Sequence, residues 1–312
     1  MSIIVTGGMG FIGSNIVKKL NSLNYKDIYI IDSPSNGSEK NLEGTVYKDI
    51  IPKDKCLQSI QNGRFCDIGK IDTIFHQGAI TDTTFTDEAE MTATNYELSV
   101  GIFHYCIENN TRLIYASSAA VYGLGKNGFE PDVDCESPLN IYAESKLNFD
   151  NYFRRNYSFD SGTQIVGLRY FNVYGPGETH KAGMASPISQ FTKQAIQNKK
   201  INVFEGSEKY LRDFVHVDDV VKVNMHFMRK TDSVGIYNCG SGKTNSFLDA
   251  AKIVANTTGA EINIIPFPDN LKDKYQSYTK ADISNLRKAG YSSDFIKFQD
   301  GGSEYAKSLL EV

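Results

Sequence analysis

The feature that most constrains the fold of this chain is a glycine-rich turn directly after its first apolar run. Residues 3–6 have the pattern of a buried β-strand, and the sequence GGMGFIG follows at residues 7–13. Glycines at this spacing allow a tight turn, a close approach of the backbone to a pyrophosphate, and close packing of the next helix on the strand. The positive end of that helix then faces the phosphates. The turn predicts a dinucleotide-binding Rossmann domain, with cofactor contacts from Gly7, Gly10, Phe11, Ile12 and Gly13.

Short apolar runs alternate with segments of helical period through the first half of the chain. Strands are predicted at residues 3–6, 27–32, 73–77, 112–117 and 164–169, and helices at residues 12–21, 96–108 and 141–157. Since crossovers between parallel strands are right-handed, this alternation gives a doubly wound parallel sheet with helices on both faces. The predicted fold class is therefore α/β.

The pattern changes after about residue 170. A helix at residues 186–197 and short strands at 201–204 and 214–216 follow a segment rich in glycine, proline and aromatic residues. A further strand, at 235–239, should join the main sheet, and residues 260–312 should form turns and short helices. We therefore predict an NAD(P)-binding Rossmann domain at residues 1–171, to which a strand and a helix near 213–256 return. A smaller α/β substrate-binding lobe is drawn mainly from residues 172–312.

Composition argues against several classes of function. A net charge of −4 without a basic run argues against a nucleic-acid partner, and no apolar stretch approaches the ~18 residues of a membrane span. The first residues read as a strand rather than as a signal peptide. The five cysteines lack Cys-x-x-Cys spacing, and the five histidines lack metal-ligand spacing. We therefore expect a cytoplasmic protein with reduced thiols, no metal, and no membrane or nucleic-acid partner.

The second predicted strand ends at Asp32, close to the position where dinucleotide-binding domains place a carboxylate on the adenosine ribose. Taken alone, this carboxylate favours NAD over NADP, because it would repel a 2′-phosphate. Lys40 and Lys53 follow nearby and would offset that repulsion, although solvated surface lysines would fit the sequence equally well. These residues by themselves therefore leave the choice between NAD and NADP open.

Tyr142 and Lys146 lie four residues apart in a predicted helix and so share one face. A lysine ammonium beside a phenol stabilises the phenolate, and we expect it to lower the pKa of Tyr142 from about 10 toward neutrality. The phenolate would then take a hydroxyl proton while a hydride leaves the carbon. Ser118 stands near the C-terminal end of a predicted strand, where ligands bind in such sheets. It would bond the reacting oxygen there; a serine that caps a turn is the alternative.

These motifs together resemble those of the extended short-chain dehydrogenase/reductase family. The resemblance rests on the glycine turn, on SSAAVYG at residues 117–123 and on YAESK at residues 142–146. The segments RYFNVYGP at 169–176 and RDFVHVDD at 212–219 extend it. The set is shared by epimerases, dehydratases and reductases. It implies a nicotinamide-dependent enzyme that acts on a sugar nucleotide, with catalytic roles for Tyr142, Lys146 and Ser118.

Three further stretches resemble the ADP-L-glycero-D-manno-heptose 6-epimerase family. They are GETHKAGMAS at residues 177–186, VFEGS at 203–207 and FPDNLKDKYQSYT at 267–279, and the match runs from Met1 to the last helix. Members of that family convert ADP-D-glycero-D-manno-heptose into its L-glycero epimer, a precursor of the lipopolysaccharide core in Gram-negative bacteria. The resemblance implies the same isomerase activity here, with NADP as cofactor and a homo-oligomeric, pentameric assembly.

The inverted carbon of that substrate, C6″, carries no acidic C–H, so the expected route is transient oxidation to a ketone and reduction from the opposite face. The ketone oxygen then points to a different side of the pocket. By the family resemblance Tyr142 would serve one epimer as acid or base, and Lys181 would serve the other. A solvated loop lysine is the alternative for Lys181. Because the same hydride returns to the sugar, the cofactor should stay bound.

The resemblance also assigns the remaining binding residues. Besides Asp32, the further cofactor-binding residues are Ser33, Lys40, Lys53, Gln77, Gly78, Ala79, Ile80, Thr81, Asn95, Lys146, Val173 and Lys181. The substrate-binding residues are Asn172, Gly183, Gln190, Phe204, Glu205, Gly206, Ser207, Arg212 and Tyr275. Arg212 suits a pyrophosphate clamp, with a structural salt bridge as the alternative. Gly183 and Gln190 depart from the family pattern, in which serine and histidine are common, and each changes one polar contact.

Two other functions fit parts of the sequence. A UDP-hexose 4-epimerase or a nucleotide-sugar dehydratase would use the same scaffold. Dehydratases of this type usually carry Thr-Asp-Glu where residues 118–120 read Ser-Ala-Ala, and a 4-epimerase has no need of the loop around Lys181. A non-catalytic nucleotide-binding protein would usually lack the tyrosine or the lysine of the catalytic pair, and this chain has both.

Overall fold

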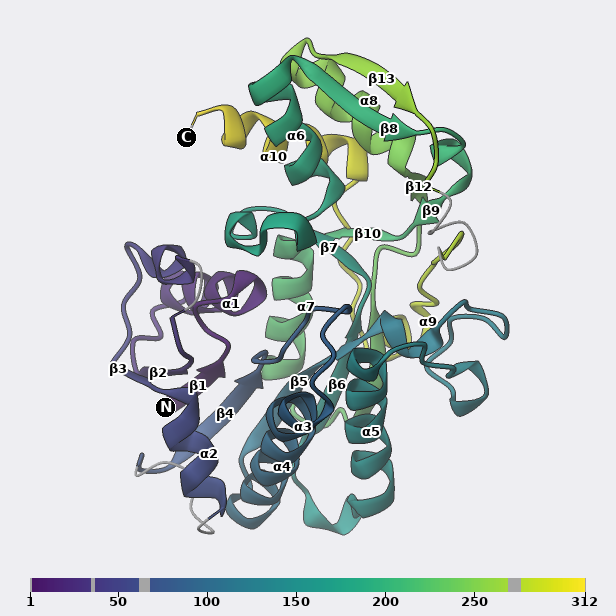
Figure 1. Ribbon diagram of the computed structural model, residues 1–312. Coiled ribbons are helices and arrows are strands. Elements are labelled where there is room, and N and C mark those ends of the chain that lie inside the picture. Colours follow the sequence, from purple (N-terminus) through teal and green to yellow (C-terminus); the bar gives the residue numbers. More distant parts are fainter. Residues whose placement is uncertain (1, 35–36, 62–67, 269–275, 312) are drawn as a thin grey trace.

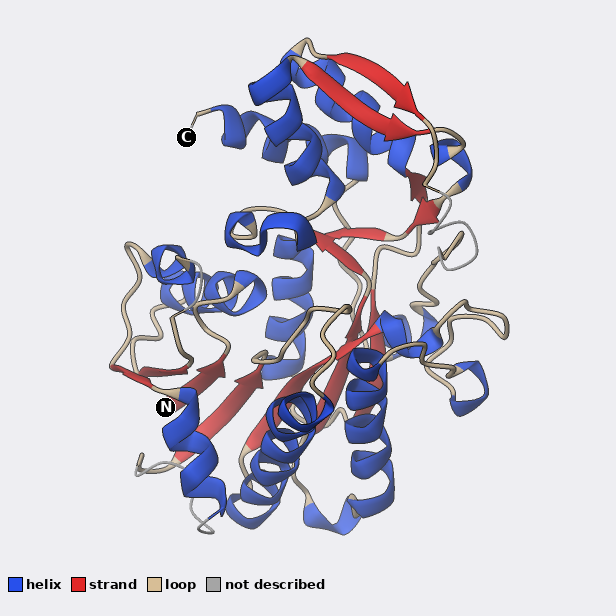
Figure 2. Cartoon of the chain, in the orientation of Figure 1, coloured by secondary structure: helices blue, strands red, loops and turns tan. Residues whose placement is uncertain are grey.

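The computed structural model describes residues 2–34, 37–61, 68–268 and 276–311, and the centre of this part of the chain is a seven-stranded parallel sheet (Figures 1 and 2). In spatial order its strands are β3 (Asp49–Ile51), β2 (Ile28–Ile31), β1 (Ser2–Thr6), β4 (Ile71–His76), β5 (Arg112–Ser118), β6 (Ile165–Tyr170) and β11 (Gly235–Cys239). Thr6 pairs with Ile31 and with His76, so the carboxyl ends of the central strands meet at one edge. This order is that of a doubly wound Rossmann sheet with one added strand, and the predicted fold class is confirmed.

Helices cover both faces of this sheet. One face carries α2 (Lys53–Gln61), α4 (Leu98–Asn109) and α5 (Ile141–Asn156), and the other carries α1 (Phe11–Ser22), α7 (Val217–Arg229) and α9 (Ser284–Lys288). Ile102 and Phe149 are buried on the first face, and Ile16 and Val220 on the second. Burial of each such side chain contributes about 1.5–3 kcal/mol, so both layers are held mainly by apolar contact with the strands.

On the first face, the N-terminus of α5 and the turns that precede α4 carry predicted site residues. Asn140 Oδ1 accepts a hydrogen bond from Ala143 N at 2.9 Å, and this cap places Tyr142 and Lys146 within the first turns of α5. Residues 96–108 were predicted as one continuous α-helix, but α4 begins at Leu98. The short helix α3 (Glu88–Met91) and a π-helical turn, Thr92–Glu97, precede it. Turns of this kind occur frequently at functional sites, and this one carries a predicted site residue.

A smaller lobe stands above the carboxyl edge of the sheet (Figure 1). It consists of α6 (Pro187–Asn198), α8 (Phe247–Thr258), α10 (Phe298–Leu310) and the parallel strands β8 (Lys200–Phe204) and β13 (Glu261–Ile265). Between the lobe and the sheet lie two strand pairs, β7 (Asn172–Tyr174) with β10 (Phe214–His216), and β9 (Leu211–Arg212) with β12 (Asn245–Ser246). Of the segment 213–256, α7 and β11 pack on the main sheet, whereas α8 packs with α6 and α10. No helix in the described ranges combines the length and the apolar character of a membrane span.

The end of the chain differs from the predicted turns and short helices, because it contains β13 and the 13-residue helix α10. Two adjacent glycines lie within α10, and each lowers helix propensity by about 1 kcal/mol relative to alanine. Their reason lies in packing. A Cβ on Gly301 would lie 2.5 Å from Tyr174 Oη, and one on Gly302 would lie 3.2 Å from Ile188 Cδ1. The glycines therefore let α10 approach its neighbours closely, although they lower the helix propensity of this segment.

Candidate active site

The glycine turn lies at the carboxyl end of β1. Gly7 has a φ of +64°, and Gly10 N donates a hydrogen bond to Gly7 O at 3.0 Å. A Cβ on Gly13 would collide with the same carbonyl oxygen, so glycine at this position lets α1 start close to β1. Gly10 is the N-cap of α1 and makes no side-chain cap, which leaves the N–H groups of the first turn as donors for a pyrophosphate.

Asp32 follows β2 and braces this turn. Its Oδ2 accepts from Met9 N and its Oδ1 from Ser33 N, both at 2.8 Å. Burial raises the pKa of Asp32, and these backbone hydrogen bonds oppose the rise. Ser33 Oγ accepts from Lys53 N at 3.4 Å, which brings the half-buried Lys53 beside the end of β2, while Lys40 is exposed. The predicted adenosine end of the site is thus grouped around Asp32, Ser33 and Lys53.

Residues 77–81 follow β4 and contain a buried donor that lacks a partner. Gln77 Oε1 accepts a hydrogen bond from Tyr170 Oη at 2.9 Å, which fixes the orientation of the amide. Gln77 Nε2 is buried and makes no hydrogen bond within the described ranges. A buried polar group without a partner costs about 1–3 kcal/mol, and a nicotinamide dinucleotide, which is rich in oxygen acceptors, would satisfy it. The Nε2 donor of Gln77 and the glycine turn therefore fit a nicotinamide dinucleotide.

Asn95, a predicted cofactor-binding residue, holds the backbone of this segment. Its Nδ2 donates to Ile80 O and to Ser145 Oγ, each at 3.0 Å, and its Oδ1 accepts from Ile80 N at 2.8 Å. The side chain is buried, and the π-helical turn places it between residues 77–81 and α5. The structure thus gives Asn95 a positioning contact, and a direct contact with the cofactor stays a prediction.

A cavity of about 290 Å³ above the carboxyl ends of β4, β5 and β6 brings the predicted catalytic residues together. Its lining contains Ser118, Tyr142, Lys146 and Lys181. The predicted binding residues Phe11, Ile12, Gln77, Ala79, Thr81, Asn172 and Val173 also line it. Ser118 Oγ accepts from Ala120 N at 3.1 Å, so this serine caps the following turn as well as facing the cavity. Most of the predicted chemistry therefore converges on one cavity.

Within the catalytic pair, the lysine makes a hydrogen bond with the backbone. Lys146 Nζ donates to Ala116 O at 2.9 Å, and burial lowers the pKa of Lys146 to about 8, with Asp150 opposing the shift. Burial raises the pKa of Tyr142, and a hydrogen bond with Ser118 opposes that shift. The prediction that Lys146 lowers the pKa of Tyr142 is wrong for this arrangement, because burial of the phenol disfavours its charged form.

Lys181 reaches the cavity from residues 177–186, which we call the Lys181 loop. Its Nζ lies 5.7 Å from the centroid of the Phe11 ring. Burial lowers the pKa of Lys181, and the nearby carboxylate of Glu178 opposes the shift. The titratable side chains of the cavity therefore come from separate elements, and they include Tyr142 on α5 and Lys181 on this loop.

A second cavity, of about 280 Å³, lies in the smaller lobe. The predicted substrate-binding residues Gln190, Phe204 and Ser207 line it, together with four aromatic rings that the sequence did not single out, those of Phe191, Tyr210, Phe247 and Phe267. The rings of Tyr210 and Phe267 are stacked with their centroids 5.2 Å apart. Stacked aromatic walls of this kind suit a planar ring, because offset stacking adds to the free energy of apolar burial.

The other predicted substrate-binding residues lie around the two cavities. Arg212 is buried, and its guanidinium lies 5.5 Å from the centroid of Phe247, a residue of the second cavity. Asn172, by contrast, lines the first cavity. Gly183, Glu205 and Gly206 line neither cavity, and Tyr275 lies outside the described residues.

Two residues that the sequence did not single out connect parts of the site. Asn41 Nδ2 donates to the carbonyl oxygens of Met9 and Gly177, each at 3.0 Å, so one amide ties the glycine turn to the Lys181 loop. The carboxylate of Glu178 is buried and accepts from the N–H and the hydroxyl of Ser186 at 2.6 and 2.5 Å. Asn41 lies in no motif, and Glu178 lies in the family stretch at residues 177–186 without an assigned role, so the three-dimensional contacts supply the role of each.

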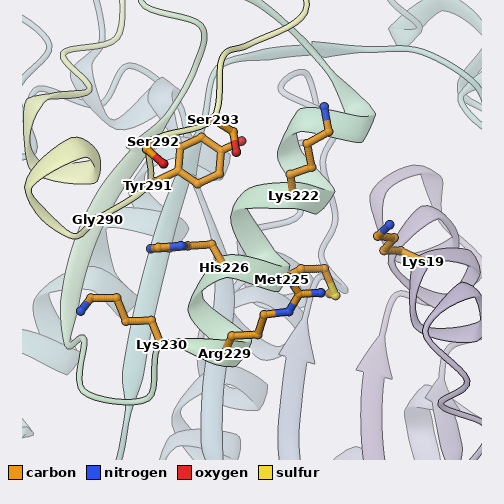
Figure 3. A pocket seen from close by; sticks show the side chains of 10 residues that line it. All are labelled: Lys19, Lys222, Met225, His226, Arg229, Lys230, Gly290, Tyr291, Ser292 and Ser293. Carbon is orange, nitrogen blue, oxygen red and sulfur yellow. The ribbon is translucent and has the colours of Figure 1, made fainter.

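A further cavity, of about 560 Å³, lies between α7 and residues 290–293 (Figure 3). It is larger than the two cavities above, but no predicted site residue lines it. Its lining is basic, and two of its cations are already paired: Lys222 with Asp219 at 2.8 Å and Lys230 with Asp232 at 3.2 Å. It is not part of the site. In the described ranges no group of three or more histidine, cysteine, aspartate or glutamate side chains is placed to hold a metal ion.

Known proteins match this chain in sequence over nearly its whole length. Residues 3–240 match the NAD dependent epimerase/dehydratase family. A protein of Brachyspira hyodysenteriae named ADP-L-glycero-D-manno-heptose-6-epimerase is 47% identical, over 98% of this chain and 97% of its own length. A protein of the same name from Alkalilimnicola ehrlichii is 42% identical, over 99% of this chain and 98% of its own length. Both relatives therefore span the Rossmann domain and the smaller lobe.

Solved structures match the fold as well. The ADP-L-glycero-D-manno-heptose-6-epimerase of Helicobacter pylori superposes with a TM-score of 0.83 at 28% identity, covering 100% of this chain and 96% of that one. The UDP-N-acetylglucosamine 4-epimerase of Methanobrevibacter ruminantium gives the same TM-score at 26% identity, over 99% and 98% of the two chains. Fold likeness alone does not separate these activities, whereas the sequence relatives do. The chain belongs to the NAD dependent epimerase/dehydratase family and, within it, to the family of the ADP-L-glycero-D-manno-heptose-6-epimerases.

Proposed function

We propose that this isomerase converts ADP-D-glycero-D-manno-heptose into ADP-L-glycero-D-manno-heptose by inverting C6″, and so supplies heptose for the lipopolysaccharide core. The observation that carries the proposal is that Tyr142 and Lys181 line one cavity, together with Ser118 and Lys146. Inversion through a ketone moves the reacting oxygen from one side of the pocket to the other. Two acid–base groups on separate elements meet that requirement. The substrate comes from the names of the relatives that are 47% and 42% identical.

The cofactor in this proposal is NADP, held through every turnover, with NAD as the alternative. When bound, the nicotinamide would accept the hydride of C6″ and return it to the opposite face of the ketone. The first turn of α1 would hold the pyrophosphate, and Gln77 Nε2 would gain the acceptor that it lacks. Asp32 accepts two backbone hydrogen bonds, which spread its negative charge, and Lys53 stands beside Ser33 at the end of β2. These contacts favour binding of the 2′-phosphate of NADP beside Lys53.

The side chains of the first cavity would divide the proton transfers. Burial raises the pKa of Tyr142, so the phenol starts protonated. Burial lowers the pKa of Lys181, so more of this amine is unprotonated and able to accept a proton than in an exposed lysine. Lys181 would take the hydroxyl proton of one epimer, and Tyr142 would give a proton to the ketone oxygen on the other side. Ser118 would share a hydrogen bond with that oxygen. Lys146, through its bond to Ala116 O, would hold the helix face that carries Tyr142 against the strand that ends in Ser118.

The second cavity would hold the nucleotide end of the substrate. Its aromatic walls, which include Tyr210 and Phe267, would stack on the adenine ring. Arg212, above the ring of Phe247, would bind the pyrophosphate that joins the two ends of the substrate. In this placement the heptose extends from the smaller lobe into the first cavity, where Asn172 lies.

We also propose that the enzyme works in the cytoplasm as a homo-oligomer. Cys106, Cys135 and Cys239 are buried free thiols, which fits a reducing compartment. The family resemblance implies the oligomer, for which we propose a pentamer. Sedimentation analysis of the purified protein tests the assembly, and a monomer under assay conditions would refute it.

The test of the activity is incubation of the purified protein with ADP-D-glycero-D-manno-heptose and no added cofactor, followed by chromatography that resolves the two epimers. We expect a mixture of both epimers and no net change in nicotinamide absorbance, because each turnover restores the cofactor. UDP-glucose serves as the comparison substrate and should remain unchanged. Consumption of cofactor in proportion to product, or conversion of UDP-glucose alone, would show that the proposed reaction is wrong.

A further inference from the structure

The backbone of the Lys181 loop is strained directly after the catalytic candidate. Ala182 has φ 47° and ψ −118° and interrupts a helical turn. The other non-glycine residues with positive φ in the described ranges are Asn24, Asn110 and Lys199, which follow or cap the C-termini of helices, where this conformation is common. Ala182 has no such place. A side chain there resists the observed conformation, so contacts on either side must hold the loop.

One end of the loop is closed by Glu178. Its carboxylate accepts from Gly175 N at 3.3 Å and from both the N–H and the hydroxyl of Ser186, which draws the two ends of the loop together. Lys181 N donates to Glu178 O at 2.9 Å and continues the turn up to the strained residue. These bonds fix the loop before Ala182 and at its far end, and Ala185 N donates to Ala182 O at 3.2 Å. The carbonyl oxygens of Gly183 and Ala185 are then available for a side-chain contact.

Gln190, one turn into α6, supplies that contact. Its Nε2 donates to Gly183 O at 3.0 Å and to Ala185 O at 2.6 Å. Both hydrogens of one neutral amide are thus directed at two carbonyl oxygens of the loop, on the C-terminal side of Ala182. The helix beneath is fixed in turn, because Ser186 caps it and Pro187 occupies its first position.

We propose that Gln190 is a positioning residue whose amide holds the Lys181 loop in its strained conformation and thereby keeps the amine of Lys181 in the first cavity. Without these two hydrogen bonds Ala182 would relax, and Lys181 would leave the Phe11 ring for solvent. There its pKa would return toward the usual value for lysine. Gln190 also lines the second cavity, so a nucleotide bound there would contact the side chain that holds the loop. The expected loss of catalysis rests on the proposed function, in which Lys181 is an acid–base group. The expected change in the conformation of the Lys181 loop does not depend on that function.

The first experiment compares Gln190→Met with Gln197→Met. Methionine preserves the length of the side chain and removes both donors, and Gln197 is an exposed residue of the same helix. We expect Gln190→Met to lower kcat by roughly tenfold, the effect of losing two hydrogen bonds of ordinary strength. The apparent pKa of the kcat profile that reports Lys181 should move to higher pH, whereas loss of a nucleotide contact alone would raise KM and leave that pKa unchanged. Gln197→Met should match the unchanged protein.

The second experiment measures opening of the Lys181 loop without an activity assay. Amide hydrogen exchange of the peptide spanning residues 179–189 should be faster in Gln190→Met than in Gln197→Met, because the loop opens more often. Adding Ala182→Gly to Gln190→Met should bring the exchange and much of kcat back, since glycine adopts the observed φ and ψ without strain. A substrate contact of Gln190 alone would not respond to a change in the backbone at residue 182.

Three outcomes would overturn the proposal. They are an unchanged kcat and exchange rate in Gln190→Met, a rise in KM alone, or the lack of any rescue by Ala182→Gly. A separate variant, Lys181→Met, distinguishes a failure of this proposal from a failure of the proposed function. If Lys181→Met retained turnover while Gln190→Met still opened the loop, the second base would be wrong and the positioning contact would stand.

Discussion

Lys146 Nζ donates a hydrogen bond to the backbone carbonyl oxygen of Ala116 at 2.9 Å. The lysine belongs to α5 and the acceptor to β5, so this bond holds the helix face that carries Tyr142 against the strand that ends in Ser118. The side chain is buried, and burial lowers its pKa to about 8. An ammonium removed from water destabilises the fold at neutral pH, and such perturbed groups collect at functional sites.

The first prediction follows from the pKa of Lys146. Its value of about 8 in the folded protein lies below that of an unfolded lysine, about 10.4, so the unfolded chain binds more protons between these two values. Below pH 8 the folded protein carries the full desolvation cost, which fades as pH rises toward 10. At pH 7 the free energy of unfolding of Lys146→Met should therefore exceed that of the unchanged protein by on the order of 2 kcal/mol. Its urea midpoint should be higher accordingly. The gap should shrink by pH 9.5.

Lys193→Met, at an exposed position of α6, is the matched control for that comparison and should show no such dependence on pH. Urea denaturation at pH 7, 8.5 and 9.5 gives the free energies of unfolding for all three proteins. A difference between Lys146→Met and the unchanged protein that stays constant over this range would mean that Lys146 titrates normally in the folded state.

The second prediction concerns the two acid–base groups. Tyr142→Phe and Lys181→Met should each abolish net epimerisation, because each blocks one half of the oxidation–reduction cycle. General acid–base groups contribute roughly 10²–10⁴-fold, so either loss is readily measured. In half-reactions, Lys181→Met should still reduce an aldehyde analogue whose oxygen is oriented toward Tyr142. Tyr142→Phe should reduce only the analogue that is oriented toward Lys181.

A dismutation assay with one aldehyde and one alcohol makes these half-reactions visible without the natural sugar. The rival mechanism uses Tyr142 for both faces and gives Lys181 only a binding role. In that case Lys181→Met would raise KM and keep substantial turnover at saturating substrate, and the second base would have to be withdrawn.

The third prediction addresses the choice of cofactor. Lys53 lies beside Ser33 through the contact of Lys53 N with Ser33 Oγ at 3.4 Å, whereas Lys55, two residues further along α2, is exposed. Lys53→Ala should weaken NADP binding by roughly tenfold or more, the size of a lost charge-assisted hydrogen bond, and NAD binding much less. Titration of both cofactors into Lys53→Ala and Lys55→Ala measures this. Equal losses for NADP and NAD would show that Lys53 does not contact the 2′-phosphate.

The fourth prediction tests the glycine turn. A Cβ at Gly13 would collide with Gly7 O, and neither backbone segment can move without separating α1 from β1. Gly13→Ala should therefore be isolated without bound nicotinamide cofactor and with lower thermal stability. Gly69→Ala, where a Cβ would meet no atom of the described residues within 4 Å, is the control and should keep both properties. Full cofactor retention in Gly13→Ala would argue against the close approach of helix and strand.

Local patterns in the sequence were sufficient for six of the seven strands of the sheet, whereas β3 (Asp49–Ile51) was not predicted. They also indicated Tyr142, Lys146 and Ser118, and the family resemblance supplied Lys181 and the other predicted residues of the first cavity. The strands at residues 214–216 and 235–239 were predicted with the bounds that the structure gives them, because short apolar runs between polar turns mark buried strands. Tyr142 and Lys146 share a face because both lie on α5. Their pKa values could not be predicted in the same way, since burial, rather than the neighbouring charge, sets the direction for each.

What the sequence by itself determined is what a short segment encodes: the glycine turn, the alternation of strand and helix, and the pairing of side chains four residues apart. What only the tertiary structure decided is which distant groups meet. The tie from Asn41 to Gly177 and the bond from Tyr170 to Gln77 arise where separate elements pack. No periodicity records such contacts, because each depends on the packing of elements far apart in the chain. The glycines of α10 make the same point, since they weaken the helix locally so that it fits against Tyr174.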